Sequence, residues 1–380
     1  MDKDSALVKL KSPEGFLYAG LPKFRALFGR DSIISAMALL DVDSSIALKT
    51  LDSLASSQGM KFNPETAEEP GKIIHEVQAD PEFIRNRINV VPWIRTGKNY
   101  FSVDSTPLFV MLYKELISGN EKKIDQRISE SASMAIRWII EYGIREKYLS
   151  YMKNHIMSQS WRDGSGFILD SMKEPVSTIG VQSYGYIALT EGIRALEKSS
   201  YEVDPEMKSQ AMLKADIIRE SLDSDFFIEE TGYYALAIDG DGVAQNAETT
   251  DPGHLLLSGM LSRKQERLIV DRLMEPDILT DYGMRCISSG SPFFDQKAYQ
   301  RGSVWPHDNL MIIMGMDARG YRKESKEIRG RITSALEAIG GFPEYFGVSG
   351  EGILMKKQEM RIVACDPQAW TVGAYHYCLA

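Results

Sequence analysis

The feature that most constrains this fold is a series of apolar helical stripes that come in pairs, separated alternately by tight turns and long polar loops. The clearest stripe places an apolar residue at every fourth position from Ile124 to Ile140, which is typical of one face of an amphipathic helix. Strands and helices do not alternate, so a doubly wound parallel sheet is disfavoured. Consecutive helix hairpins predict an all-α toroid closed on itself, and an open solenoid is the alternative.

These stripes predict eleven helices, whereas six complete hairpins need twelve. Residues 1–30 are predicted to form an irregular segment that packs on the barrel, and residues 31–380 to form the barrel itself. A short strand and turn at 233–242 predict minor β-hairpins in the long loops. The predicted helices are 31–40, 46–54, 105–116, 124–140, 179–198, 205–223, 252–260, 263–274, 305–318, 321–339 and 366–380.

Two of the predicted helix starts carry side chains suited to capping. Asp31 or Ser32 opens the first helix, and Asp104 precedes a serine, a threonine and Pro107. A short side-chain oxygen at this position accepts a backbone N–H, and proline fits the first helical turn. Asp31 or Ser32, and Asp104, are therefore predicted to cap their helices.

Charge and cysteine content narrow the class of partner and the compartment. The chain has 44 basic and 53 acidic side chains, a net charge of −9, which disfavours nucleic acid and anionic membrane and favours a neutral or cationic ligand. Cys286, Cys365 and Cys378 are widely spaced and odd in number, as expected of reduced residues in a cytoplasmic protein. No apolar run approaches the ~18 residues that span a bilayer, and the charged N-terminus is unlike a signal peptide. Oligomeric state is not indicated.

In a toroid, the loops that join one hairpin to the next lie on the same face. Binding and catalytic groups concentrate on such loops. Asp163 follows a tryptophan and an arginine in one of them, and Glu344 follows Pro343 among aromatic residues in another. We therefore expect these two carboxylates to meet across one pocket. The loops on this face are 59–100, 148–175, 275–304 and 341–365.

Glycoside hydrolysis is the chemistry that suits two such carboxylates. It needs one carboxylic acid to protonate the leaving oxygen and one carboxylate to activate water or to attack directly. Aromatic faces and planar polar groups are also needed to hold the sugar. Taken singly, a residue of this kind is more often a loop brace or a solvated turn residue, but as a set on one face the candidates favour a sugar site. The candidates are Trp93, Trp161, Trp305, Tyr345, Phe346, Arg30, Asp31, Asp308, Asn309 and Gln368.

Other chemistries are not supported by the sequence. It has no phosphate-binding loop, nucleophile elbow or zinc-protease motif. The five histidines are scattered, so neither a metal nor an organic cofactor is expected. The segment 239–242, Asp-Gly-Asp-Gly, lacks the remaining ligands of a calcium loop and is predicted to be a hairpin turn.

Short segments along the whole chain match, in order, the motifs of one enzyme group. The chain resembles the amylo-α-1,6-glucosidase, or glycogen-debranching-type, glycosidases of the six-hairpin toroid group. Each motif alone is weakly specific, but their common order makes the resemblance specific. The segments are Gly20-Leu21-Pro22, Phe28-Gly29-Arg30-Asp31-Ser32, Gly71-Lys72-Ile73-Ile74-His75-Glu76, Ser102-Val103-Asp104-Ser105-Thr106-Pro107, Trp161-Arg162-Asp163, Asp251-Pro252-Gly253-His254-Leu255-Leu256, Gly302-Ser303-Val304-Trp305-Pro306-His307-Asp308-Asn309, Pro343-Glu344 and Ala364-Cys365-Asp366-Pro367-Gln368-Ala369-Trp370.

The resemblance implies an (α/α)6 barrel and an inverting, exo-acting glucosidase that works on α-glucosides without a cofactor. It implies that Asp163 is the general acid and Glu344 the general base. The substrate-binding residues that it implies are Arg30, Asp31, Trp161, Trp305, His307, Asp308, Gln368 and Trp370.

Within this reading, Asp163 is expected to be protonated by burial beside Trp161, with Arg162 pointing away from it, and Glu344 to be ionised. Two alternatives stay open. One is a hydrolase of another small glycoside, such as a mannosyl or trehalose-type solute, and the other is a non-catalytic carbohydrate-binding toroid. Linkage, sugar and chain-length preference are not determined by the sequence.

Overall fold

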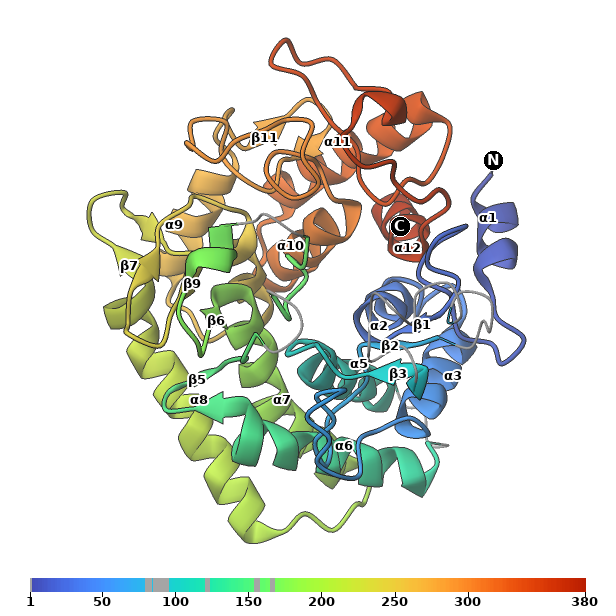
Figure 1. The fold of residues 1–380 in the computed structure, drawn as a ribbon, viewed down its shortest axis with the longest axis vertical. Helices are drawn as coiled ribbons and strands as arrows, with labels where there is room; N and C mark the ends of the chain where they lie inside the picture. Colours follow the sequence, from blue (N-terminus) through green and yellow to red (C-terminus); the bar gives the residue numbers. More distant parts are fainter. Residues whose placement is uncertain (1, 79–83, 85–95, 120–123, 154–157, 165–167) are drawn as a thin grey trace.

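The computed structural model describes residues 2–78, 84, 96–119, 124–153, 158–164 and 168–380; the candidate Trp93 lies outside them. Its centre is a ring of six helices in which each packs against the next and the last returns to the first (Figure 1). The predicted all-α (α/α)6 toroid is therefore confirmed. The inner helices are α2 (Gly29–Ala38), α5 (Ser105–Ser118), α7 (Ile179–Lys198), the 3₁₀ helix η4 (Asp251–Leu257), α10 (Pro306–Arg319) and α12 (Ala369–Leu379).

Outer helices pack on the inner ring and show the one-sided burial that their position requires. In the last of them, the buried residues Ile328, Ile332, Ala335 and Leu336 fall on one face. By contrast, every residue of α2 is buried. The outer helices are α1 (Lys3–Leu10), α3 (Ser44–Ala55), α6 (Gln126–Trp138), α8 (Pro205–Phe226), α9 (Arg263–Leu273) and α11 (Arg322–Ile339).

Helix α1 is absent from the sequence prediction, which treated residues 1–30 as irregular. It packs against α12 and supplies the outer partner of that inner helix (Figure 1). Only Ala6 and Leu10 of its eight residues are fully buried, so the apolar stripe is too short to be recognised. A second difference is at 252–260, where the predicted helix is a 3₁₀ helix that ends at Leu257.

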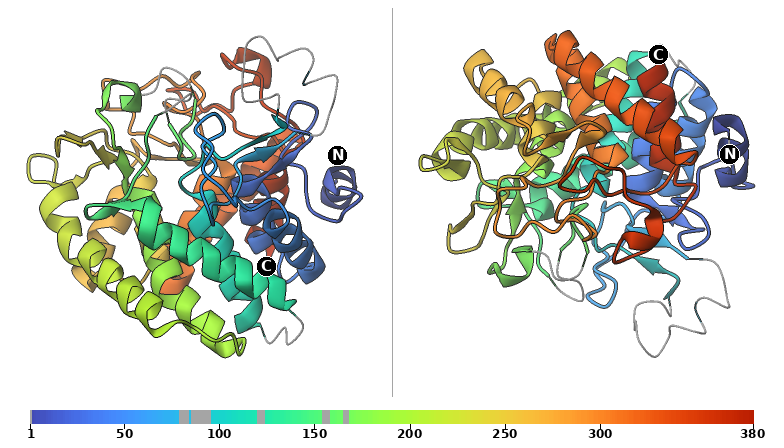
Figure 2. Two further views of the ribbon diagram at one scale, coloured as in Figure 1. Left: turned by 60° about the horizontal axis from the view of Figure 1, so that its bottom comes forward. Right: turned by 90° about the horizontal axis from the view of Figure 1, so that it is seen from above.

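Short antiparallel strands lie in the long connections, at one end of the ring (Figure 2). The predicted minor hairpins are thus confirmed. Two strands, β1 and β6, run directly into inner helices α2 and α7 and fix where those helices begin. The three-stranded sheets are β1 (Leu27–Phe28), β2 (Glu76–Val77) and β3 (Lys98–Asn99), and β10 (Ala244–Gln245), β9 (Ala237–Ile238) and β6 (Ser177–Thr178); the pairs are β4 (Ile144–Arg145) with β5 (Tyr148–Leu149), β7 (Phe227–Ile228) with β8 (Tyr233–Tyr234), and β11 (Leu279–Thr280) with β12 (Gly283–Met284).

The two rings differ in how their helices begin. Five outer helices have a side-chain cap, from Asp2, Asp43, Asp125, Asp204 and Ser262. None of the six inner helices has one. The partial positive charge of an uncapped N-terminus is available to nearby anions.

The predicted caps are accordingly wrong for both inner helices concerned. Helix α2 begins two residues before Asp31, and its N-cap is Phe28. Asp104 is the N-cap of α5, but its carboxylate makes no capping bond. The reason is that these polar side chains bond across the ring, as described below.

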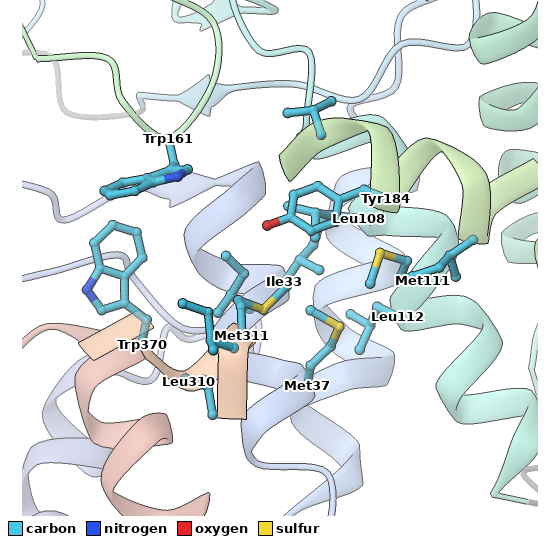
Figure 3. Packing of buried hydrophobic residues seen from close by; sticks show 14 of the residues in the cluster. Ile33, Met37, Leu108, Met111, Leu112, Trp161, Tyr184, Leu310, Met311 and Trp370 are labelled. Atoms are coloured by element: carbon cyan, nitrogen blue, oxygen red, sulfur yellow. The ribbon is translucent and has the colours of Figure 1, made fainter. Parts of the chain in front are cut away.

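Apolar side chains of the inner helices fill the ring beneath its loop end. Ile33, Leu108 and Met311, from three different helices, lie together below Trp161 and beside Trp370 (Figure 3). Trp161 therefore lies at the loop end of this core. Within the described ranges, no helix combines the length and apolar character needed to cross a membrane.

Candidate active site

Asp163 lies on the loop that precedes β6, and its side chain is 31% exposed, whereas most of its neighbours are buried. Its Oδ2 accepts a hydrogen bond from Nη1 of Arg30 at 3.0 Å. The expected burial of Asp163 is therefore wrong, because the residue is exposed. Its neighbours nevertheless remove part of its solvation, which raises the pKa of Asp163 above its ordinary value, and the charge of Arg30 opposes that rise. The carboxyl group is thus held in place by Arg30 through one of its two oxygens.

Arg30 connects Asp163 to the barrel. It is 3% exposed, and its Nε and Nη2 bond to the two oxygens of Asp104 at 2.8 and 3.1 Å. This two-point contact with a carboxylate is the strong geometry for arginine, and Ser102 adds a third bond to Asp104 at 2.6 Å. Burial lowers the pKa of Arg30, but Asp104 and Asp163 outweigh it, so the guanidinium stays charged.

Arg162 is directed away from Asp163, as expected. It is fully buried, and its Nε donates to Oδ2 of Asp251 at 2.7 Å. Its Nη2 donates to the carbonyl of Cys286 at 2.6 Å. The same Asp251 accepts the indole N–H of Trp161 at 3.0 Å. Both residues before Asp163 are therefore anchored at the first residue of η4.

Glu344 is nearly inaccessible, with 3% of its surface exposed. Its Oε1 accepts the hydroxyl of Tyr299 and its Oε2 accepts the backbone N–H of Cys365 at 3.3 Å. Burial is the main reason that the pKa of Glu344 rises to about 7, and the charge of Asp163 contributes. The sequence-based expectation of an ionised base therefore holds only above neutral pH.

Electrostatics links the two carboxyl groups to a third. Burial raises the pKa of Asp31 to about 8; Arg30 opposes this shift, and both Asp163 and Glu344 add to it. Nε2 of Gln368 donates to Asp31 at 3.1 Å. Asp163 and Glu344, remote in sequence, thus lie within electrostatic reach of each other and of Asp31 at the uncapped end of the inner ring.

Aromatic rings surround these groups. His307 stacks on Trp370 with ring centres 4.1 Å apart and meets the edge of Trp161 at 5.0 Å. Trp305 stacks on Tyr345 at 5.0 Å. Both ring nitrogens of His307 are buried without a hydrogen-bond partner among the described residues, and burial holds its pKa well below the ordinary value. A neutral imidazole with two unused nitrogens can accept and donate a hydrogen bond to a ligand.

Asp308 and Asn309 are predicted sugar contacts that the structure does not bring to the site. Asn309 is fully buried, and its amide donates to the carbonyls of Met284 and Trp305, both at 3.0 Å. Asp308 is fully buried, and its two oxygens bond to Thr250 at 2.7 Å and His254 at 2.8 Å. His254 in turn contacts the hydroxyl of Tyr184 at 2.5 Å. This chain of bonds joins η4, α10 and α7 behind the aromatic rings, so Asp308 supports the site from within the barrel.

Four residues that serve this site were not identified as site residues from the sequence. Asp104 and Asp251 hold the arginines, and Tyr299 and Gln300 contact Glu344 and the Asp163 loop. The two aspartates stand in motifs that matched the resemblance, which is a usable signal. Tyr299 and Gln300 have no periodic or motif signal. Among the described residues, no three His, Cys, Asp or Glu side chains are grouped as a metal site.

A family comparison identifies the chain. The sequence profile of the mannosylglycerate hydrolase MGH1-like glycoside hydrolase domain matches residues 147–350, more than half of the chain. The chain belongs to this family. It is a glycoside hydrolase, and the resemblance to six-hairpin glycosidases is confirmed at that level, without its debranching specificity. No curated protein matches the sequence significantly.

Solved structures agree with the fold of this family. The GH63 mannosylglycerate hydrolase from Thermus thermophilus, in complex with Tris and D-glycerate, has a TM-score of 0.73 at 13% identity, and the match covers 100% of both chains. The same enzyme in complex with glucose gives 0.73 at 16% identity, covering 100% of this chain and 99% of that chain. Neutral trehalase Nth1 from Saccharomyces cerevisiae gives 0.59 at 14%, covering 94% of this chain and 72% of the trehalase. At such identities the similarity shows the fold alone.

Proposed function

We propose that this glycoside hydrolase inverts the anomeric centre, with Asp163 as general acid and Glu344 as general base. The observation that carries the proposal is that two consecutive residues contact both carboxyl-bearing loops: Tyr299 bonds to Glu344, and Gln300 bonds to the backbone on both sides of Asp163. Both have raised pKa values, which suits groups that exchange protons near neutral pH. Inversion requires the carboxyl groups to stand ~6.5–9.5 Å apart, leaving room for a water molecule.

In this mechanism Asp163 gives its proton to the glycosidic oxygen as the bond to the anomeric carbon breaks. Glu344 takes a proton from the water that attacks that carbon from the opposite face. The hydroxyl of Tyr299 and the N–H of Cys365 hold Glu344 in place. After release of the products, Asp163 regains a proton and Glu344 loses one to solvent.

The sugar is proposed to lie against the aromatic group of Trp161, Trp305, His307 and Trp370. The unpaired ring nitrogens of His307 would bond to sugar hydroxyls, and Arg30 and Asp31 would contact the ring from α2. Gln368 would act through Asp31, to which it already bonds.

The substrate is proposed to be a small glycoside of the mannosylglycerate or trehalose type. The family profile and the full-length similarity to a mannosylglycerate hydrolase support this class over a branched polymer. Glucosides such as isomaltose are the runner-up, following the debranching-type resemblance. An anionic aglycone such as glycerate would be stabilised by the partial positive charge at the N-termini of the inner helices, whereas a neutral aglycone would not.

The test is a panel containing mannosylglycerate, glucosylglycerate, trehalose, maltose and isomaltose. Proton NMR during the first turnovers identifies the anomer released, and inversion is expected. Asp163→Asn and Glu344→Gln should each abolish turnover while circular dichroism stays unchanged. Full activity in either variant would remove that residue from the mechanism, and a retained anomer would overturn inversion.

A further inference from the structure

Gln300 contacts the backbone on both sides of Asp163. It is 3% exposed. Its Nε2 donates to the carbonyl of Trp161 at 2.6 Å, and its Oε1 accepts the N–H of Gly164 at 2.8 Å. A primary amide offers a donor and an acceptor side by side, so this one side chain satisfies the peptide groups that flank the acid.

The main chain of Gln300 reaches the same loop. Its carbonyl accepts Nη1 of Arg162 at 3.2 Å. Residues 161, 162 and 164 are therefore all bonded to Gln300, while the side chain of Asp163 points instead to Arg30. Gln300 thus fixes the main chain around the acid, while Arg30 holds the carboxyl group of Asp163 itself.

Tyr299, the residue before Gln300, bonds to the other carboxyl group, that of Glu344. The hydroxyl of Tyr299 donates to Glu344, and the carbonyl of Tyr299 accepts the indole N–H of Trp305 at 2.8 Å. Two consecutive residues, Tyr299 and Gln300, thus bond to the base and to the acid loop. Because one peptide unit links them, the position of that unit sets the separation of the two carboxyl groups.

We propose that Gln300 is a positioning residue that holds the Asp163 loop at the distance from Glu344 that inversion requires, acting as one unit with Tyr299. This inference rests on the proposed function, since it needs Asp163 to be the acid. The hydrogen bonds of Gln300 to described residues go to the Asp163 loop, and Gln300 does not itself act on the substrate. Its loss should therefore impair proton donation and leave substrate binding and the action of Glu344 largely intact.

Leaving-group chemistry separates these effects. A glycosidic oxygen needs a proton in order to leave, whereas fluoride leaves a glycosyl fluoride with little proton donation. We expect Gln300→Ala to lower kcat on the O-glycoside roughly 10- to 100-fold, the cost of a small misplacement of a catalytic group, with KM nearly unchanged. The kcat on the matching glycosyl fluoride should stay near the unaltered value. Asp163→Asn should show the same pattern in stronger form, and Glu344→Gln should lose both activities.

A second variant provides rescue by pH. Gln300→Glu keeps the shape of the side chain. Its carboxyl group can accept from the N–H of Gly164 in either protonation state, but it can donate to the carbonyl of Trp161 only when protonated. The ratio of O-glycoside to fluoride turnover should therefore recover toward the unaltered ratio as pH falls, whereas Gln300→Ala should show no recovery. The ratio cancels the titration of Glu344, which affects both reactions. Comparison with the unaltered enzyme and with Gln300→Ala at the same pH cancels the titration of Asp163, which affects only the O-glycoside.

Gln296→Ala is the matched control, because this glutamine lies in the same loop and makes no hydrogen bond to residues 161–164 in the described structure. It should leave the ratio unchanged. Equal losses on both substrates, a raised KM with unchanged kcat, or a Gln300→Glu ratio that comes no closer than that of Gln300→Ala to the unaltered ratio at low pH would each overturn the inference alone. Absence of turnover of any glycoside or glycosyl fluoride by the unaltered chain would overturn the proposed function, and the inference with it.

Discussion

Removing one hydroxyl group should move the pH dependence of this enzyme. The hydroxyl of Tyr299 donates to Oε1 of Glu344, and this bond favours the ionised carboxylate. Burial acts in the other direction and is stronger, so the pKa of Glu344 is about 7. In Tyr299→Phe the stabilisation of the charged form is lost, and the pKa must rise further.

The size of the shift follows from the strength of the bond. A hydrogen bond to a charged group contributes about 1.5–3 kcal/mol, and one pKa unit corresponds to about 1.36 kcal/mol. The expected rise is therefore roughly 1–2 units. Because the base must be ionised, kcat/KM falls on the acid side of this pKa, and that limb should move upward by the same amount.

The assay is kcat/KM against pH between about 5 and 9, a profile that reports the pKa values of the free enzyme. Tyr345→Phe is the control, since it removes a hydroxyl from the neighbouring ring, whose partner is the carbonyl of Ile362. Its acid limb should match that of the unaltered enzyme. Superimposed acid limbs for Tyr299→Phe and the unaltered enzyme would refute the role given to this bond.

Three further outcomes are expected. The pKa of Glu344 is about 7 in the folded protein and 4.5 ordinarily, so the free energy of unfolding falls as pH rises from 4.5 to 7. In urea unfolding, Glu344→Gln should be more stable than the unaltered protein by up to about 3 kcal/mol at pH 8 and by almost nothing at pH 4.5. Arg30→Met leaves the carboxylate of Asp104 buried without its partner and should lower the free energy of unfolding by about 3–5 kcal/mol. Adding Asp104→Leu should restore most of this loss, and an equal loss in the double variant would contradict the pairing. Leu10→Ala should lower the free energy of unfolding by about 2–5 kcal/mol because this side chain is fully buried. Val8→Ala, at a position 75% exposed, should change it little, and equal effects would mean that α1 is not part of the barrel.

The fold was largely predictable because long helices leave long patterns. The stripe at 179–198 coincides with α7, since twenty residues give five turns of periodic burial. Helix α1 was missed because eight residues place only Ala6 and Leu10 fully inside. At 252–260 a proline and a glycine stand near the start, and the segment forms a shorter 3₁₀ helix.

Site residues could be predicted from the sequence where they stand in recognisable motifs, but not where only their contacts in the folded chain show their role. Asp163 and Glu344 were predicted from their settings, and the structure brings their loops together, while their catalytic roles stay a prediction. Tyr299 and Gln300 lie in a loop without periodicity, so only the folded chain reveals their partners. His307 and Asp308 are consecutive on a helix and project in different directions; the pattern could not tell that Asp308 bonds to Thr250 and His254, whereas His307 packs among aromatic rings.

The ring of helices closes at a seam between the beginning and the end of the described chain. Backbone bonds join Ala19 to Ala369 and Leu21 to Pro367, and the bond between Gln368 and Asp31 crosses the same seam. During synthesis on the ribosome, Arg30 of α2 can therefore bond to Asp104 early, whereas Asp31 acquires its partner Gln368 only when that residue has been made. Turnover should appear only once α12 packs against α2, so that activity itself reports closure of the ring.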